Sequence, residues 1–164
     1  MATFGLYFNQ PVNLPEKLTH LTFRGYFSGN FNQPVNLPEN LTHLTFGYNF
    51  NQLVDLPSSI IFLRLDCVNT SIIDYLPESI EELELDESFN LELNNLPNSI
   101  KKIRFYNNNY NKELNCLPSN VEFLQLPKYY THKILNIPKG LKKVICSSNY
   151  KFISDFENIE VETY

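Results

Sequence analysis

The sequence has little of what metal, phosphate and nucleic-acid sites usually require. Glycine occurs only five times in 164 residues, and none of these glycines builds a phosphate-binding loop. The three cysteines follow no metal-ligand spacing. Lysine and arginine together number 13 against 18 aspartates and glutamates, which gives a net charge of -5. This balance argues against nucleic acid as the main partner, because phosphate binding needs a basic surface.

Long apolar runs and targeting signals are also missing. No run of about 18 apolar residues occurs, so we expect no membrane-spanning helix. The first residues, Met1 to Gly5, have neither the basic start nor the apolar segment of a signal peptide. We therefore predict a cytoplasmic protein that is not secreted and binds no membrane. We expect Cys67, Cys116 and Cys146 to be free thiols, mostly buried, in a reducing compartment.

What the sequence does contain is a repeat. A Leu-Pro pair, once replaced by Ile-Pro, recurs at steps of 23, 19, 20, 20, 21 and 20 residues. The pairs are Leu14–Pro15, Leu37–Pro38, Leu56–Pro57, Leu76–Pro77, Leu96–Pro97, Leu117–Pro118 and Ile137–Pro138. Proline has a fixed φ and no N–H, and it pushes the preceding residue into extended geometry. Each pair is therefore incompatible with a helix interior and turns the chain into the next segment.

Each pair is followed by the same spacing of apolar residues. One stands three residues after the proline, the next three residues further on, and the last two residues beyond that. The copies are Leu18, Leu21, Phe23; Leu41, Leu44, Phe46; Ile60, Leu63, Leu65; Ile80, Leu83, Leu85; Ile100, Ile103, Phe105; Val121, Leu124, Leu126; and Leu141, Val144, Cys146. Residues two apart point to the same side of an extended strand. Each copy therefore predicts a short strand with one buried face.

A second pattern follows the strands. An aromatic residue and then a polar one, most often asparagine, recur at Phe31–Asn32, Phe50–Asn51, Phe89–Asn90, Tyr110–Asn111, Tyr130–Thr131 and Tyr150–Lys151. We expect the rings to form a second buried column behind the strands. We expect the asparagine side chains to hydrogen-bond backbone groups of the loops.

Units of about 20 residues cannot bury an apolar face alone, whereas stacked units can. The sequence therefore predicts a leucine-rich-repeat-like solenoid that is mostly β. We expect one parallel sheet of about seven to nine short strands. The backs of the rungs should be extended, polyproline-like or 3₁₀, with few or no α-helices.

A single repeat domain is predicted over residues 1–164. Residues 1–13 form a partial N-terminal rung, because residues 3–9 match residues 45–51. The repeats start near residues 14, 37, 56, 76, 96, 117 and 137, with an insertion around residues 24–30. Residues 147–164 form a C-terminal cap with a degenerate strand marked by Phe156, Ile159 and Val161, whose charged alternates Glu160 and Glu162 discourage edge pairing.

These patterns carry a family resemblance. The segments Phe8–Asn9–Gln10–Pro11 and Phe31–Asn32–Gln33–Pro34, and the degraded Phe50–Asn51–Gln52–Leu53, resemble the FNIP repeat, as does the Leu-Pro segment that follows each of them. FNIP repeats are grouped with leucine-rich repeats and occur in social amoebae and in giant DNA viruses of amoebae. The resemblance covers nearly the whole chain and implies a solenoid that binds other proteins.

Many viral members of this family carry an F-box ahead of the repeats and are thought to recruit proteins to a ubiquitin ligase. Here the repeat pattern starts at the first residues, so we expect no F-box. The resemblance then implies binding rather than ubiquitin transfer.

The side chains that alternate with the buried strand positions point outward and are free to specialise. We predict a partner-binding face made of Phe62, Arg64, Glu82, Glu84, Lys102, Arg104, Tyr106 and Phe123. Exposed aromatic and arginine side chains are typical anchors of protein interfaces. The alternative is that these charges only pair with one another across neighbouring strands, which stabilises a sheet modestly.

Two smaller groups of residues are candidates for a metal site and for a pair of catalytic acids, and neither is favoured. His20 and His43 hold equivalent positions on adjacent rungs, but no third ligand joins them, so exposed polar residues are favoured over a metal pair. Glu82, Glu84 and Asp86 are expected on an exposed face beside cations, which does not favour paired catalytic acids. We predict no enzyme activity, no catalytic residues, no cofactor and no metal.

The leading hypothesis is therefore a protein–protein interaction module, in a viral setting a host-directed adaptor acting in the host cytoplasm. The alternative is a structural protein that self-associates through an uncovered sheet edge at its N-terminal end, as a homodimer or a larger assembly.

Overall fold

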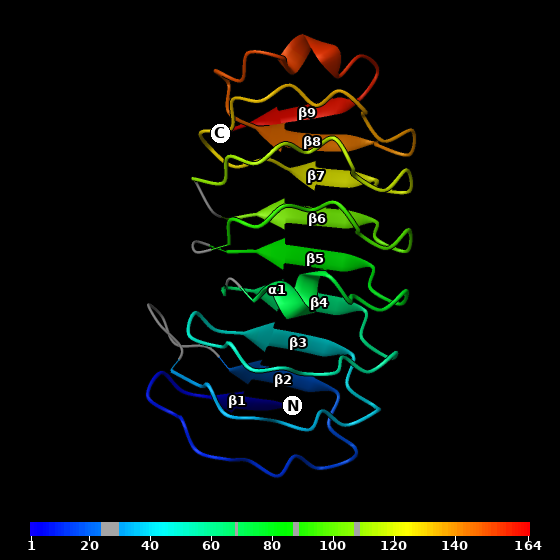
Figure 1. The fold of residues 1–164 in the computed structure, drawn as a ribbon. Helices are drawn as coiled ribbons and strands as arrows, with labels where there is room; N and C mark the ends of the chain where they lie inside the picture. The colour runs from blue at the N-terminus through cyan, green and yellow to red at the C-terminus, as the bar shows by residue number, and fades with distance from the viewer. Residues whose placement is uncertain (24–29, 68, 87–88, 107–108) are drawn as a thin grey trace.

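The computed structural model describes residues 1–23, 30–67, 69–86, 89–106 and 109–164. Short parallel strands stack in chain order into one nine-stranded sheet (Figure 1). The strands are β1 (Ala2–Phe4), β2 (His20–Phe23), β3 (His43–Phe46), β4 (Phe62–Leu65), β5 (Glu82–Leu85), β6 (Lys102–Phe105), β7 (Phe123–Gln125), β8 (Lys143–Cys146) and β9 (Glu160–Thr163). The predicted solenoid and its parallel sheet are confirmed.

The strands pair at the positions that the repeat spacing predicts. Leu44 on β3 lies opposite Leu21 on β2 and Leu63 on β4, and the same register continues across the sheet. The turn into each strand follows the Leu-Pro pair, because the carbonyl of the proline accepts a hydrogen bond from the N–H three residues later. Examples are Leu41 N to Pro38 O at 3.0 Å and Ile60 N to Pro57 O at 3.2 Å.

Two columns of side chains fill the interior. The strand leucines and isoleucines form the first and are almost completely buried. The predicted aromatic column forms the second: Phe31, Phe50, Phe89, Tyr110, Tyr130 and Tyr150 are all buried. Rings of successive rungs lie over one another; the centroids of Phe31 and Phe50, for example, are 6.0 Å apart. Apolar area removed from water in both columns is the main driving force of this fold.

The asparagines behind these rings link successive rungs. Asn9 Oδ1 accepts a hydrogen bond from the backbone N–H of Asn32 at 2.9 Å, and Asn32 Oδ1 accepts one from the N–H of Asn51 at 2.8 Å. Asn90 Oδ1 accepts one from the N–H of Asn111 at 3.5 Å. The expected role of these side chains is confirmed: each accepts a loop N–H of the next rung.

The backs of the rungs are mostly extended, as predicted, with two short exceptions. Helix α1 (Thr70–Ile73) lies between β4 and β5, and the 3₁₀ helix η1 (Ile153–Asp155) lies between β8 and β9. The rung of α1 lacks the aromatic residue of its neighbours, and Ile72 and Ile73 on the helix are buried instead. The side chain of Asn69 caps this helix by accepting a hydrogen bond from the N–H of Ser71 at 3.1 Å.

The last strand of the described sheet is β9, which contains Val161 of the degenerate strand pattern. β9 pairs in parallel with β8 and brings Val161 opposite Val144. Lys143 Nζ lies 2.8 Å from a carboxylate oxygen of Glu160 and 2.8 Å from one of Glu162, and these hydrogen bonds raise the pKa of Lys143. Of the predicted insertion around residues 24–30, residues 24–29 lie outside the described part of the chain.

The described residues include no helix that is long and apolar enough to cross a bilayer. The three cysteines are free, and two are buried, Cys67 and Cys146, whereas Cys116 is exposed. Burial raises the pKa of Cys67 to about 11 and also raises that of Cys146. These two thiols act as small apolar side chains of the core rather than as nucleophiles.

Candidate partner-binding face

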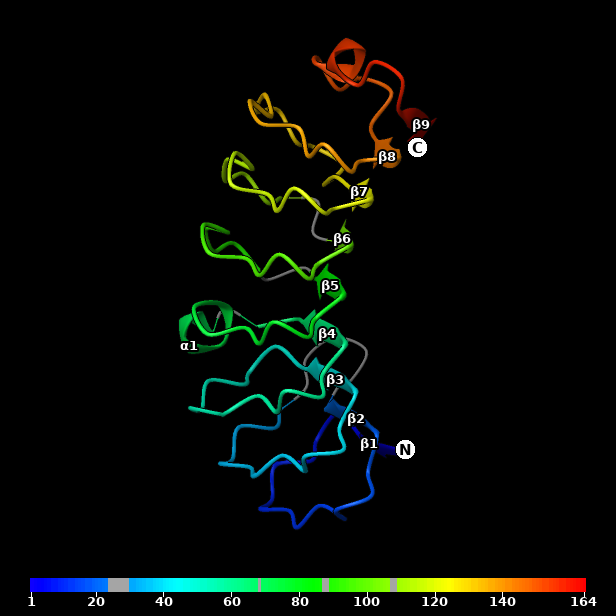
Figure 2. The same cartoon turned by 90° about the vertical axis from the view of Figure 1, so that its right-hand side faces the viewer.

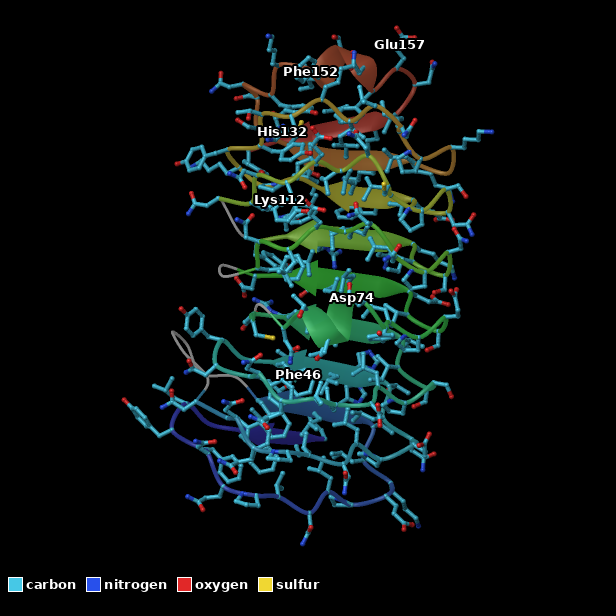
Figure 3. The ribbon with its side chains drawn as sticks, in the orientation of Figure 1. Phe46, Asp74, Lys112, His132, Phe152 and Glu157 are labelled. Carbon is cyan, nitrogen blue, oxygen red and sulfur yellow. The ribbon has the colours of Figure 1, made fainter. Side chains whose placement is uncertain are left out.

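The strands are stacked along a bowed line, and their outward face lies on the concave side (Figure 2). Figure 3, in the orientation of Figure 1, looks onto the backs of the rungs, where Asp74, Lys112 and His132 lie. The parallel register sets equivalent outward side chains beside one another on neighbouring strands. We call this surface the strand face; it consists of the outward residues of β1–β9 together with Asp66, Asp86 and Tyr106.

An ion network occupies the centre of the strand face, with Arg64 at its middle. Arg64 Nε lies 3.3 Å from Asp66 Oδ1, and Arg64 Nη1 lies 3.3 Å from Glu84 Oε2. Arg64 Nη2 donates to Asp86 Oδ2. The guanidinium thus contacts carboxylates from the ends of β4 and β5 at once, a use of its fixed donor fork that lysine could not reproduce.

The network continues onto β6. Arg104 Nη1 lies 3.2 Å from Glu84 Oε1 and 3.6 Å from Glu82 Oε2, and Lys102 Nζ lies 2.5 Å from Glu82 Oε1. Glu84 therefore bridges the two arginines. The charges of β4, β5 and β6 thus pair laterally across neighbouring strands.

Tyr106 lies over this network. Its hydroxyl donates to Glu84 Oε1 at 3.3 Å, and the guanidinium carbon of Arg64 lies 4.8 Å from its ring centroid. Burial, and then the neighbouring charge of Glu84, raise the pKa of Tyr106. One edge of the ring stays in solvent, since 40% of the residue is exposed. The side chain is thus both held in place and accessible.

The expectation that the acidic residues stand on an exposed face needs a correction. Glu84 and Asp86 are each only 7% exposed, because the Arg64 guanidinium covers them. Each is satisfied inside the network, so neither offers a free carboxylate to a ligand or a catalytic pair.

Aromatic side chains border the network on both sides. Phe62 stacks on His43 at a centroid distance of 5.6 Å, and Arg104 lies over the ring of Phe123 at 4.9 Å. The eight predicted residues therefore come together as one contiguous group on β4–β7. Ile61, which precedes β4, is a further exposed apolar residue next to Phe62 in the sequence, with 42% of its surface exposed. Sequence reasoning missed it, although its place beside the first outward position of the strand could have indicated it.

Two histidines lie on the N-terminal part of the strand face. The rings of His20 and His43 stack with a centroid distance of 4.1 Å and an interplanar angle of 12°. Their Nδ1 atoms each lie 2.9 Å from the hydroxyl of the preceding threonine, Thr19 or Thr42. Within the described ranges, no group of three or more His, Cys, Asp or Glu side chains is placed to hold a metal ion.

This architecture is a leucine-rich type of solenoid, a scaffold used for protein interaction rather than for enclosed active sites. The chain belongs to the FNIP repeat family, which matches residues 31–67, 69–108 and 90–129. No curated protein matches the chain.

Among solved structures, the chain is similar to CroV588, described as a novel circular LRR protein structure. The two share 24% sequence identity and a TM-score of 0.37, over 98% of this chain and 39% of that one. The chain spans about two fifths of the length of that protein.

Proposed function

We propose that the chain is a protein-binding module whose partner docks on the concave strand face around Phe62, Tyr106 and Phe123. The observation that carries this proposal is that solvent-reaching aromatic rings are held in place by a satisfied ion network. Arg64 and Arg104 each lie against one of these rings, Tyr106 and Phe123. Side chains fixed before binding lose little entropy on binding, and aromatic and arginine residues dominate the energy of interfaces.

The internal pairing of charges changes which residues should carry the affinity. The buried carboxylate of Glu84 positions the arginines and Tyr106, whereas the rings make the contact. Charged groups that already satisfy one another specify the shape of the face rather than attract a partner over distance. A protein partner fits this surface better than nucleic acid, because the chain has a net charge of -5.

Membership of the FNIP family supports a host-directed adaptor as the setting of this binding, with a cytoplasmic host protein as partner. No catalytic role, cofactor or membrane contact is part of the proposal. The acidic side chains at the centre of the strand face are engaged with arginine and lysine.

Replacing Tyr106 and Phe123 together by alanine is expected to weaken partner binding by at least about 30-fold, the loss typical of interface hot spots. The partner is captured from an amoebal lysate, identified by mass spectrometry, purified, and titrated against wild type and variant by calorimetry.

The matched control replaces Leu53 and Tyr75 by alanine, two residues outside the strands that are 84% and 81% exposed. This control should bind like wild type. Equal affinity for the wild type and the Tyr106/Phe123 variant, with both folded, would place the partner site elsewhere on the chain.

Self-association is the second candidate function, and one observation favours it. β1 is the first strand of the sheet order, so its outer edge pairs with no strand of the described residues. The ring of Phe4 on β1 lies 4.5 Å from that of Phe8, and both residues are only partly buried. A second copy could cover this edge and these rings.

Self-association through β1 predicts a dimer whose mass depends on concentration in analytical ultracentrifugation. The Tyr7→Asp variant, changed at a residue that is 83% exposed in the same turn, should shift the equilibrium toward monomer. A wild-type chain that stays monomeric over the whole concentration series removes this candidate.

A further inference from the structure

His20 and His43 form a two-ring stack that is continued by Phe62. The three residues are aligned by the parallel register of β2, β3 and β4. The imidazoles lie face to face at 4.1 Å, and the second imidazole lies 5.6 Å from the ring of Phe62. Uncharged rings can remain in this arrangement, whereas two imidazolium rings at this distance repel each other.

Thr42 orients the ring of His43. The Thr42 hydroxyl lies 3.1 Å from the carbonyl oxygen of Thr19 and 2.9 Å from His43 Nδ1. The same carbonyl oxygen accepts the backbone N–H groups of Thr42 and His43, at 2.9 and 3.0 Å. The ring of His43 is therefore held through Nδ1 beside the ring of His20.

Little negative charge is available to compensate a charged pair. β1, β2 and β3, all described in full, contain no aspartate or glutamate. Beyond them, β4 contributes Arg64 and β5 contributes Glu82 and Glu84, while the backbone ammonium of Met1 precedes β1. Burial and then the charge of His20 lower the pKa of His43, and only Glu82 opposes them.

We propose that the His20–His43 pair is an acid-operated switch in the strand face. At neutral pH the two imidazoles stack on each other, and His43 also stacks on Phe62. On acidification the second proton separates the rings and moves His43 off Phe62, while the leucine column below stays in place. The consequence that acid weakens partner binding rests on the proposed function, since Phe62 belongs to that site; the switch itself does not.

The linked change in stability has a defined sign. Because the pKa of His43 lies below its ordinary value of 6.5 in the folded chain, the unfolded chain takes up this proton first as the pH falls. The contribution of the neutral stack is therefore complete above about pH 6.5 and is lost as the pH falls from there through the lowered pKa of His43.

The experiment is a histidine titration by long-range ¹H–¹⁵N NMR on the full chain, with no partner present. We expect a His43 midpoint below 6.5. The Phe62 ring signals should change along the second protonation step. His20→Phe keeps a ring but removes the charge, so it should raise the His43 midpoint and abolish the acid-induced change at Phe62.

His132→Gln is the matched control, because His132 lies on the back of the solenoid (Figure 3). It should leave the His43 midpoint unchanged. An unchanged His43 midpoint in folded His20→Phe, or Phe62 signals that stay constant through both protonations, would overturn the proposal. Because the titration needs no partner, failure to find a binding partner leaves this test intact.

Discussion

Replacing Phe46 by alanine should lower the free energy of unfolding by about 3–5 kcal/mol, the usual cost of removing a buried aromatic ring. Phe46 is completely buried, and its ring lies 3.9 Å from that of Phe50 and 6.0 Å from that of Phe23. It therefore joins the strand column to the aromatic column and links two rungs. The rungs cannot shift to fill the cavity left by alanine, because the pairing of β3 with β2 and β4 holds them in register.

Urea denaturation followed by circular dichroism measures the loss, and amide hydrogen exchange locates it. Because each rung of a solenoid contacts mainly its neighbours, protection should fall most in β2, β3 and β4. Tyr48→Ala is the control, since Tyr48 lies in the same turn but is 53% exposed and should cost less than about 0.5 kcal/mol. Similar losses for the two variants would mean that the aromatic column does not hold the rungs together.

Replacing Arg64 by alanine should destabilise the chain by about 3–5 kcal/mol, because it leaves a cluster of poorly hydrated carboxylates without their main counter-charge. The side chain of Arg64 is 16% exposed, and those of Asp66, Glu84 and Asp86 are 14%, 10% and 9% exposed. The variant also removes the cation that lies over Tyr106. We expect the ring of Tyr106 to become more mobile as well.

Lys101→Ala provides the comparison, since Lys101 pairs with Glu81 at 3.0 Å while both side chains are 50% exposed. This surface pair should contribute less than about 1 kcal/mol. Adding Glu84→Gln to Arg64→Ala should recover part of the loss, and a double-mutant cycle measures the coupling. If Arg64→Ala costs no more than Lys101→Ala, the central network is a solvated surface feature and cannot position the strand face.

The strands could be predicted almost residue by residue, whereas the helix α1 could not. Strands β2–β8 are each indicated by the preceding Leu-Pro or Ile-Pro pair and by the spacing of Leu63 and Leu65 or their equivalents, and these are local signals. α1 occurs where that local pattern loses its aromatic residue, and four residues of helix are too few to show a periodicity. Its one signal was Asn69, which caps the helix through the N–H of Ser71.

The sequence could predict which residues of the candidate site lie beside one another, but not how exposed each of them is. Rung equivalence placed Arg64 beside Glu84 and His20 beside His43, and both pairs lie in register. It could not show that Glu84 is covered by arginine, because that depends on side-chain rotamers. The direction of Phe62 toward His43 depends on the same choice. Partner binding at these residues stays a prediction.

The sequence by itself determined the repeat, the parallel strands and their register, since a side-chain period of two and the restrictions imposed by proline act over a few residues. Only the tertiary structure decided which outward side chains meet water and which satisfy one another. Stacking sets residues some twenty positions apart within about 4.8 Å across the sheet. At that separation, Arg64 contacts three carboxylates and the two histidine rings lie face to face. Both arrangements depend on how side chains of neighbouring rungs pack, which no single repeat encodes.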